Sequence, residues 1–103
     1  MAQKILIVDD EPHIRELVGA VLESEGYDVD RAEDGPNALE KLKKNKYSLV
    51  VLDMMMPGMS GFEVCRVLRD DPALADVPVL LVTALDDRKS LIEGIESGAD
   101  DFI

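Results

Sequence analysis

Three short runs of the chain are apolar without a polar residue inside them. They cover residues 5–8, 49–52 and 79–82, and a polar residue follows each of them. Such a run is typical of a strand that is buried on both faces of a parallel sheet. We therefore predict central strands at residues 4–8, 49–53 and 77–83.

Between these runs, apolar residues recur every three or four positions, which indicates amphipathic helices. The first helix is expected to begin at Pro12 and to be capped by Gly26, because proline suits the first helical turn and glycine suits the C-terminal cap. We expect its apolar positions to form one face of the helix. These positions are Ile14, Leu17, Val18, Val21 and Leu22.

Three further helices are expected within residues 34–46, 60–72 and 86–98. The third helix has the strongest start signal, because Ser60 and Glu63 have the spacing of a capping box. The inward-facing residues of these helices follow from the same helical spacing. They are Ala38, Leu39, Leu42, Phe62, Cys65, Leu68, Leu91, Ile92 and Ile95.

Residues 27–32 and 101–103 complete the pattern as two more strands, the first of which is more polar and is expected at a sheet edge. Strands and helices then alternate along the whole chain. This alternation predicts a parallel sheet with helices on both faces. Such sheets bind ligands beyond the carboxyl ends of their strands.

Four polar residues stand at those carboxyl ends: Asp9, Asp10, Asp53 and Thr83. Carboxylates about 4 Å apart repel each other by roughly 1–4 kcal/mol per pair, depending on the local dielectric. A cluster of three therefore indicates a cation. Oxygen ligands without a nearby Cys or His favour Mg²⁺ over Zn²⁺.

The role of Asp53 has two interpretations at this point. It is either a third metal ligand or a nucleophile, because a carboxylate can form an aspartyl phosphate. Thr83 is placed to donate a hydrogen bond to a phosphoryl oxygen, and the small Ala84 beside it leaves access open.

The composition limits the class of protein. With 103 residues, the chain is one domain at most. It has no apolar run of about 18 residues, no signal-peptide pattern and only one Cys, so we expect a soluble protein of the reducing cytoplasm. A net charge of −11 argues against direct binding of nucleic acid by this domain.

Four motifs, in this order, resemble the receiver (phosphoacceptor) domains of two-component response regulators. They are Ile-Leu-Ile-Val-Asp-Asp-Glu-Pro at 5–12, Val-Val-Leu-Asp-Met-Met-Met-Pro-Gly-Met-Ser-Gly at 50–61, Val-Thr-Ala at 82–84 and Gly-Ala-Asp-Asp-Phe at 98–102. The resemblance covers the whole chain. It implies a flavodoxin-like, doubly wound parallel sheet with strand order 2-1-3-4-5.

The resemblance also implies a function and a role for each site residue. Asp53 accepts a phosphoryl group from a sensor histidine kinase or a phosphotransfer protein, and the domain then switches conformation to control an effector. Asp10 ligates Mg²⁺, Asp9 assists, and the backbone carbonyl of Met55 is a further ligand. Thr83 senses the phosphate and Phe102 is the switch aromatic. We do not expect the domain to be an enzyme, except that it assists its own phosphorylation and dephosphorylation.

One departure from the family pattern concerns the end of the chain. The family places a Lys two residues after the position of Ile103, then a Pro and a fifth helix. We therefore expect residues 1–103 to be a C-terminally truncated receiver domain without the fifth helix. The first helix would then lie alone on one sheet face. We expect the chain to self-associate through that bare face, for instance as a homodimer, to exchange an element with a second copy, or to be markedly unstable.

Two other functions are also consistent with parts of this pattern. A hydrolase of the haloacid dehalogenase type also uses an Asp at a strand end, but needs a second Asp two residues later, where this chain has Met55. That alternative is discounted. A phosphorylation-independent interaction domain stays open, because the family Lys is missing.

Overall fold

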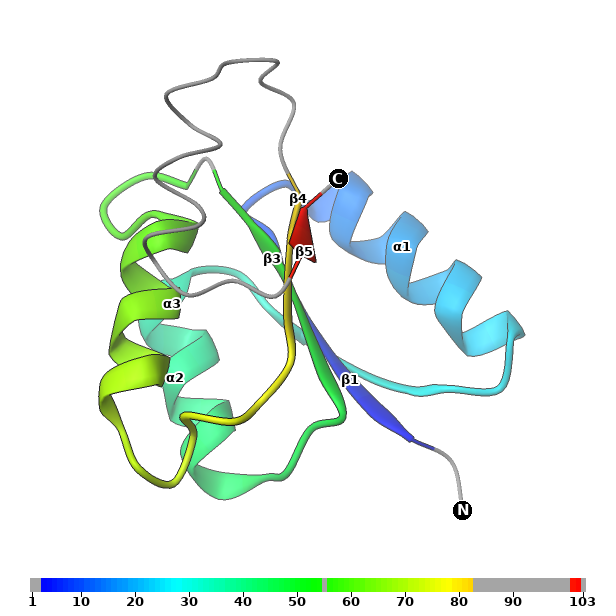
Figure 1. Ribbon diagram of the computed structural model, residues 1–103. Coiled ribbons are helices and arrows are strands. Elements are labelled where there is room, and N and C mark those ends of the chain that lie inside the picture. The colour runs from blue at the N-terminus through cyan, green and yellow to red at the C-terminus, as the bar shows by residue number, and fades with distance from the viewer. Residues whose placement is uncertain (1–2, 55, 83–100, 103) are drawn as a thin grey trace.

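The computed structural model describes residues 3–54, 56–82 and 101–102. Strands and helices alternate as the sequence predicts (Figure 1). In chain order the elements are β1 Lys4–Val8, α1 Pro12–Ser24, β2 Asp28–Ala32, α2 Gly35–Lys44, β3 Leu49–Asp53, α3 Gly61–Asp70, β4 Val79–Val82 and β5 Asp101–Phe102. The helix expected within residues 86–98 lies outside the described residues.

All neighbouring strands of the sheet are parallel, and their order is β2-β1-β3-β4-β5. The predicted fold class and strand order are therefore confirmed, including the edge position of β2. Val8 pairs with Leu52, and Asp53 pairs with Val82. This register brings the carboxyl ends of β1, β3 and β4 to the same edge of the sheet.

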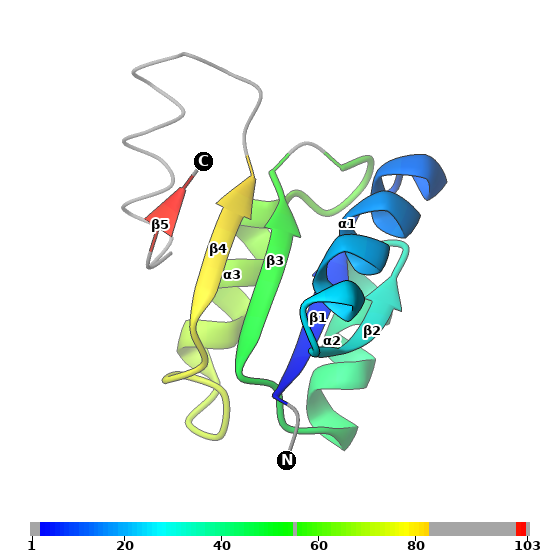
Figure 2. The ribbon, with the colours of Figure 1, turned by 90° about the vertical axis from the view of Figure 1, so that its right-hand side faces the viewer.

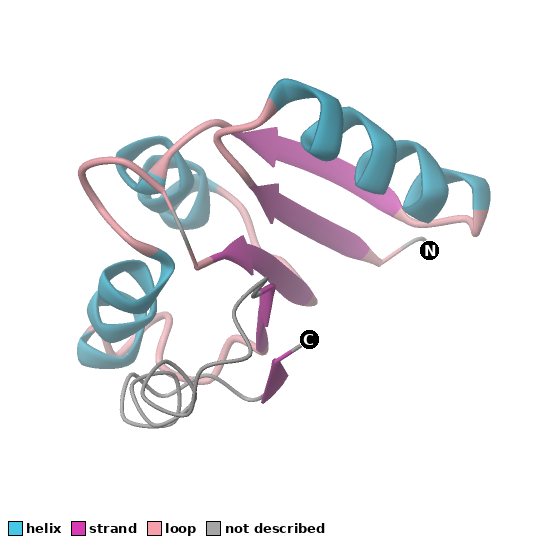
Figure 3. Cartoon of the chain, turned by 90° about the horizontal axis from the view of Figure 1, so that it is seen from above, coloured by secondary structure: helices cyan, strands magenta, loops and turns pink. Residues whose placement is uncertain are grey.

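The helices lie on both faces of the sheet. Figures 2 and 3 show α1 on one face and α2 and α3 on the other. Side chains alternate between these faces along each strand, so that Leu52 packs under α2 and α3 whereas Val51 packs under α1. No helix among the described residues is long and apolar enough to cross a membrane.

Side-chain caps fix where two helices begin. The Asp34 carboxylate accepts a hydrogen bond from the backbone N–H of Asn37 at 2.8 Å, which starts α2. The Ser60 hydroxyl accepts one from the backbone N–H of Glu63 at 3.3 Å, which starts α3 as the capping-box spacing predicts. Each cap marks the end of a loop that leaves the carboxyl edge of the sheet and the start of the helix that follows it.

Two strands begin later than their sequences suggest. The N–H of Tyr27 donates to the carbonyl of Leu22 at 3.2 Å, so Tyr27 belongs to the end of α1 and β2 starts at Asp28. β4 starts at Val79 because Pro78 has no N–H to donate to the sheet, although its carbonyl accepts from Val50 at 2.9 Å.

The apolar pattern of α1 is wider than the surface that the helix buries. Val18 and Leu22 pack against the sheet. Ile14, Leu17 and Val21, in contrast, are 42 %, 62 % and 54 % exposed. The helix is as predicted, but its apolar positions do not all face the sheet.

Candidate functional site

Three carboxylates meet at the carboxyl edge of the sheet. One carboxylate oxygen each from Asp9, Asp10 and Asp53 lies within 4.8 Å of the others. This follows from the register, because Val8 and Leu52 are paired and each is followed directly by an acid. Asp9 is buried, Asp53 is half-buried and Asp10 is exposed. The cluster is thus open to solvent on one side.

Asp9 is held in place by the turn that leads into α1. Its Oδ1 accepts a hydrogen bond from the backbone N–H of Glu11 at 2.9 Å. Its backbone carbonyl accepts a hydrogen bond from the Arg15 guanidinium at 2.8 Å, and its N–H donates to Ala32 at 3.2 Å. The Asp9 carboxylate is therefore positioned before any ligand arrives.

Asp53 is positioned by the close approach of α3 to the end of β3. A Cβ atom added at Gly61 would lie 2.4 Å from the Asp53 carbonyl oxygen and 2.9 Å from the Cα of Met54. The N–H of Gly61 donates to the Met54 carbonyl at 3.2 Å. Only glycine allows this contact, which connects the start of α3 to the strand end that carries Asp53.

The donor set of the cluster fits a magnesium ion. Carboxylate oxygens are the ligands that Mg²⁺ prefers, and three negative charges at this separation repel unless a cation lies among them. A cavity of about 300 Å³ opens at the exposed side of the cluster. Its lining residues are Asp10, Pro12, Arg15, Glu33, Asp34 and Pro57. Asp10 is therefore the acid of the cluster that this cavity opens to solvent.

Not every residue that the sequence indicates is described. The structure brings together Asp9, Asp10 and Asp53, whereas Met55 and Thr83 lie outside the described residues. Phe102 lies in β5, where its backbone pairs with Leu81 of β4.

Two residues of the site were not indicated by the sequence. They are Arg15, whose guanidinium donates a hydrogen bond to the Asp9 carbonyl, and Gly61, which lies against the end of β3. A basic residue one turn after the acid pair, and a glycine directly after a helix cap, are the signals that were available.

The sequence model of the response regulator receiver domain matches residues 5–103. The chain belongs to this family. It is 50 % identical over 104 residues to the response regulator PleD of Caulobacter vibrioides, and the match covers 100 % of this chain and 23 % of PleD. Most of that relative therefore lies outside the part that this chain matches.

Solved structures agree with the family assignment. The chemotaxis protein CheY4 of Vibrio cholerae is 33 % identical with a TM-score of 0.95, over 100 % of this chain and 86 % of CheY4. The response regulator TrrA of Thermotoga maritima, solved in complex with Mg²⁺ and BeF, is 42 % identical with a TM-score of 0.86, over 98 % of this chain and 84 % of TrrA. Receiver domains accept phosphoryl groups in two-component signalling, bind Mg²⁺ at an acidic pocket and interact with histidine kinases or phosphotransfer proteins.

Proposed function

We propose that this receiver domain accepts a phosphoryl group on Asp53, in a Mg²⁺-dependent reaction, from a phosphohistidine of a sensor histidine kinase or a phosphotransfer protein. The observation that carries the proposal is the convergence of the Asp9, Asp10 and Asp53 carboxylates within 4.8 Å at the open edge of the sheet. The TrrA complex supports it, because a relative with the same fold was solved with Mg²⁺.

In this proposal, Asp9 and Asp10 have different roles toward Mg²⁺ because they differ in burial. Asp10, which is exposed, would ligate the metal directly, and Asp9, held by the N–H of Glu11, would support it from the buried side. The backbone carbonyl of Met55 would supply a further ligand. When bound, Mg²⁺ neutralises charge on the acids and on the phosphoryl oxygens.

In the transfer step, a carboxylate oxygen of Asp53 attacks phosphorus while the phosphorus–nitrogen bond of the phosphohistidine breaks. The imidazole, which carries a proton on its other ring nitrogen, leaves with the bonding electron pair and so becomes the neutral histidine of the donor. Thr83 then donates a hydrogen bond to a phosphoryl oxygen, and Phe102 changes position as the switch aromatic. The module signals to an effector and does not turn over an external substrate.

The partners follow from the same proposal. The donor is a kinase or phosphotransfer protein that places its phosphohistidine at the cavity beside Asp10. Residues 1–103 act as one receiver domain located in the cytoplasm. Copies of the domain also associate through the α1 side of the sheet, for which a test is given in the Discussion.

Metal binding is tested by thermal unfolding with and without millimolar Mg²⁺. The ion binds the native state, so the melting temperature of the parent should rise. Asp10→Asn removes a ligand and the repulsion of Asp10 with both Asp9 and Asp53. It should therefore raise the melting temperature without Mg²⁺ and abolish the further rise with Mg²⁺. Asp76→Asn is the matched control, because Asp76 is an exposed acid that is not part of the cluster. This variant should respond to Mg²⁺ as the parent does. A parent that is insensitive to Mg²⁺ would exclude the metal assignment.

Phosphorylation is tested with acetyl phosphate and Mg²⁺. Intact-mass measurement should show one added phosphoryl group that is labile to hydroxylamine, and Asp53→Asn should lack it. Asp76→Asn should be labelled like the parent. A label that persists in the Asp53→Asn protein would show that another residue is the acceptor. A domain that stays unlabelled although it binds Mg²⁺ would instead favour the phosphorylation-independent interaction domain.

A further inference from the structure

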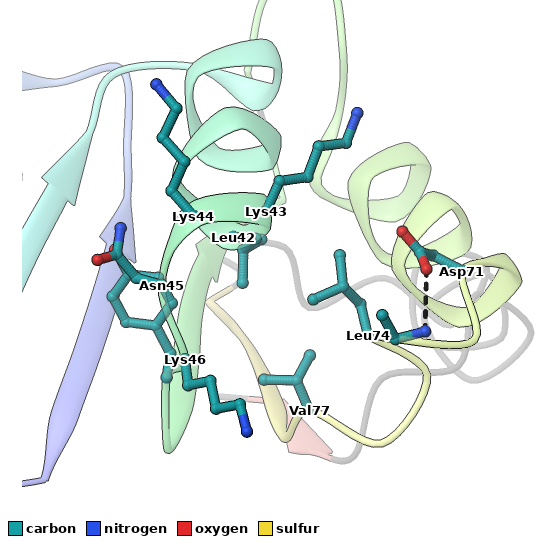
Figure 4. A pocket seen from close by; sticks show the side chains of 10 residues that line it. Leu42, Lys43, Lys44, Asn45, Lys46, Asp71, Leu74 and Val77 are labelled. Carbon is teal, nitrogen blue, oxygen red and sulfur yellow. Dashed lines mark hydrogen bonds between the residues drawn. The ribbon is translucent and has the colours of Figure 1, made fainter.

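A second cavity lies at the end of the sheet opposite to the acid cluster. It has a volume of about 520 Å³ and lies between the C-terminal end of α2 and the connection from α3 to β4 (Figure 4). Its lining residues are Leu42, Lys43, Lys44, Asn45, Lys46, Tyr47, Asp71, Ala73, Leu74 and Val77. None of these belongs to the proposed phosphoacceptor site.

The floor of this cavity is apolar. Figure 4 shows the side chains of Leu42, Leu74 and Val77 pointing toward one another. Tyr47 also lines the cavity, and its hydroxyl already donates a hydrogen bond to the Asp30 carboxylate at 2.6 Å. The floor therefore presents hydrocarbon to an occupant.

The rim carries a concentration of positive charge. Of the chain's 11 basic residues, four stand within six positions of each other: Lys41, Lys43, Lys44 and Lys46. The last three of them line the cavity. This cluster is unusual in a chain whose net charge is −11.

The lysines of the rim are not all accounted for by local structure. Lys44 pairs with Glu40 at 3.2 Å, and a basic residue in the last turn of a helix is favoured by the helix dipole. Lys46 follows the Asn45 cap and is outside α2. Among the described residues, neither Lys43 nor Lys46 forms an ion pair.

The acidic residue of the rim does not oppose this charge directly. Figure 4 places Asp71 across the cavity from Lys44 and Lys46, whereas the Lys43 side chain extends from α2 toward the side of Asp71. Its carboxylate accepts a hydrogen bond from the backbone N–H of Ala73 at 2.9 Å, within its own turn. Positive charge therefore dominates the α2 side of the opening.

We propose that this cavity binds a small apolar molecule with one anionic head group, such as a carboxylate. Its volume is in the range of small-ligand pockets, which are mainly apolar with a few polar groups that fix orientation. The hydrocarbon of the ligand lies on Leu42, Tyr47, Leu74 and Val77. Its head is bound by Lys43 or Lys46, which extend in different directions in Figure 4 and whose long stems allow either ammonium group to turn toward the opening.

The test uses decanoate as the probe, below its micelle-forming concentration, with decanol as the neutral probe of equal chain length. Amide and methyl NMR signals of Leu42, Tyr47, Leu74 and Val77 should shift in a saturable manner with decanoate. Because each exposed charge pair contributes little, decanoate should bind only about fivefold more tightly than decanol. This preference should shrink as salt is added.

Variants then separate the two parts of the cavity. Lys43→Gln combined with Lys46→Gln should remove the preference for decanoate over decanol, whereas Arg66→Gln, an exposed charge on α3, should leave it intact. Leu74→Ala should weaken both probes, with its melting temperature measured to show that the fold is kept. Asp53→Asn should bind both probes as the parent does, because the acid cluster is at the other end of the sheet. Shifts centred elsewhere, equal binding of the two probes by the parent, or no saturable shift would each overturn the proposal.

Discussion

The two faces of the sheet are built from similar side chains but are buried to different degrees. On the face under α2 and α3, the described residues form a cluster of 16 buried side chains. On the face under α1, the apolar cluster of the described residues has three buried members, Ile5, Ile7 and Val51, and the side chains packed against it are partly exposed. The strands supply Val, Leu and Ile to both faces, so burial is decided by the helices that cover them.

The helices explain the difference. α3 contributes Phe62, Val64, Cys65 and Leu68 to the larger cluster, and α2 contributes Ala38 and Leu42 to it on the same face. α1 contributes only two partly buried side chains, Val18 and Leu22. The face under α2 and α3 is thus a packed core, while the α1 face is a thinner layer.

The largest expected effect comes from two adjacent leucines of β4 that point to opposite faces. Leu81 is 0 % exposed under α3, whereas Leu80 is partly exposed on the α1 face. Leu81→Ala should lower the free energy of unfolding by about 3 kcal/mol, because it leaves a cavity in packed surroundings. Leu80→Ala should cost about 1 kcal/mol, because less apolar surface is lost. Urea unfolding measures both, and equal losses would contradict the contrast between the faces.

A second pair of substitutions compares how closely a helix approaches on each face. A Cβ at Gly61 of α3 would meet the backbone of β3, whereas a Cβ at Gly19 of α1 would meet the end of the Arg31 side chain. Gly61→Ala should therefore cost about 2 kcal/mol, because backbone must move. Gly19→Ala should be nearly neutral, because the guanidinium moves aside and alanine favours the helix by up to about 1 kcal/mol.

The same pair also reports on the site. Gly61→Ala displaces the strand end that carries Asp53, so it should slow labelling by acetyl phosphate in the protein that remains folded. Gly19→Ala should be labelled at the parent's rate. A stable Gly61→Ala protein with parent-like labelling would show that the contact does not position the acceptor.

This comparison also shows what the sequence could and could not predict. Apolar runs such as residues 49–52 predict buried strands, and the alternation of elements predicts their order, because both depend on local pattern and chain connectivity. The meeting of Asp9 and Asp53 was predictable for the same reason, since parallel strands end at a shared edge. How completely each face is covered depends on packing between distant segments, which no local pattern contains.

Two details illustrate this limit. Leu17 has the same spacing as Val18 and Leu22, but α1 is oriented so that Leu17 faces solvent. Gly61 lies in a segment whose residue types indicate a loop, and its contact with Asp53 depends on the packing of α3 on β3. In both cases the local sequence predicts the helix, but it does not predict which other elements the helix packs against.

Polar contacts at β2 extend the comparison, because Asp30 is bound to Tyr47 whereas its neighbour Arg31 pairs with Glu16 and Glu23 of α1. Tyr47→Phe should cost about 1 kcal/mol, since it removes a hydrogen bond to a carboxylate. Glu16→Gln should cost a few tenths of a kcal/mol, because that carboxylate is largely exposed. Chemical unfolding at neutral pH measures both changes.

The pH dependence of unfolding tests the Tyr47 contact further. The hydrogen bond from Tyr47 lowers the pKa of Asp30 below its usual 3.8, so this stabilisation is present above pH 3.8 and is lost as the pH falls further. Burial, and then the hydrogen bond to Asp30, raises the pKa of Tyr47 above its usual 10, so that stability is lost as the pH rises beyond 10. Tyr47→Phe should flatten the curve at both ends. An unchanged curve would show that the contact does not contribute.

The smallest expected effect on folding concerns the exposed apolar residues of α1. Ile14, Leu17 and Val21 are exposed on the face where Leu80 and Val82 are also only partly covered. Leu17→Gln should change the free energy of unfolding by less than about 0.5 kcal/mol, since Leu17 is 62 % exposed.

Exposed apolar surface of this kind favours association, and a pair of identical surfaces forms a two-fold dimer. Light scattering over a dilution series should therefore show a mass that rises with concentration for the parent and rises less for Leu17→Gln. Val67→Thr, at an exposed position of α3 on the other face, is the matched control and should behave as the parent does. A parent that keeps the monomer mass at every concentration, or a control that reduces association equally, would show that the thinner cover of the α1 face is sufficient for a monomer.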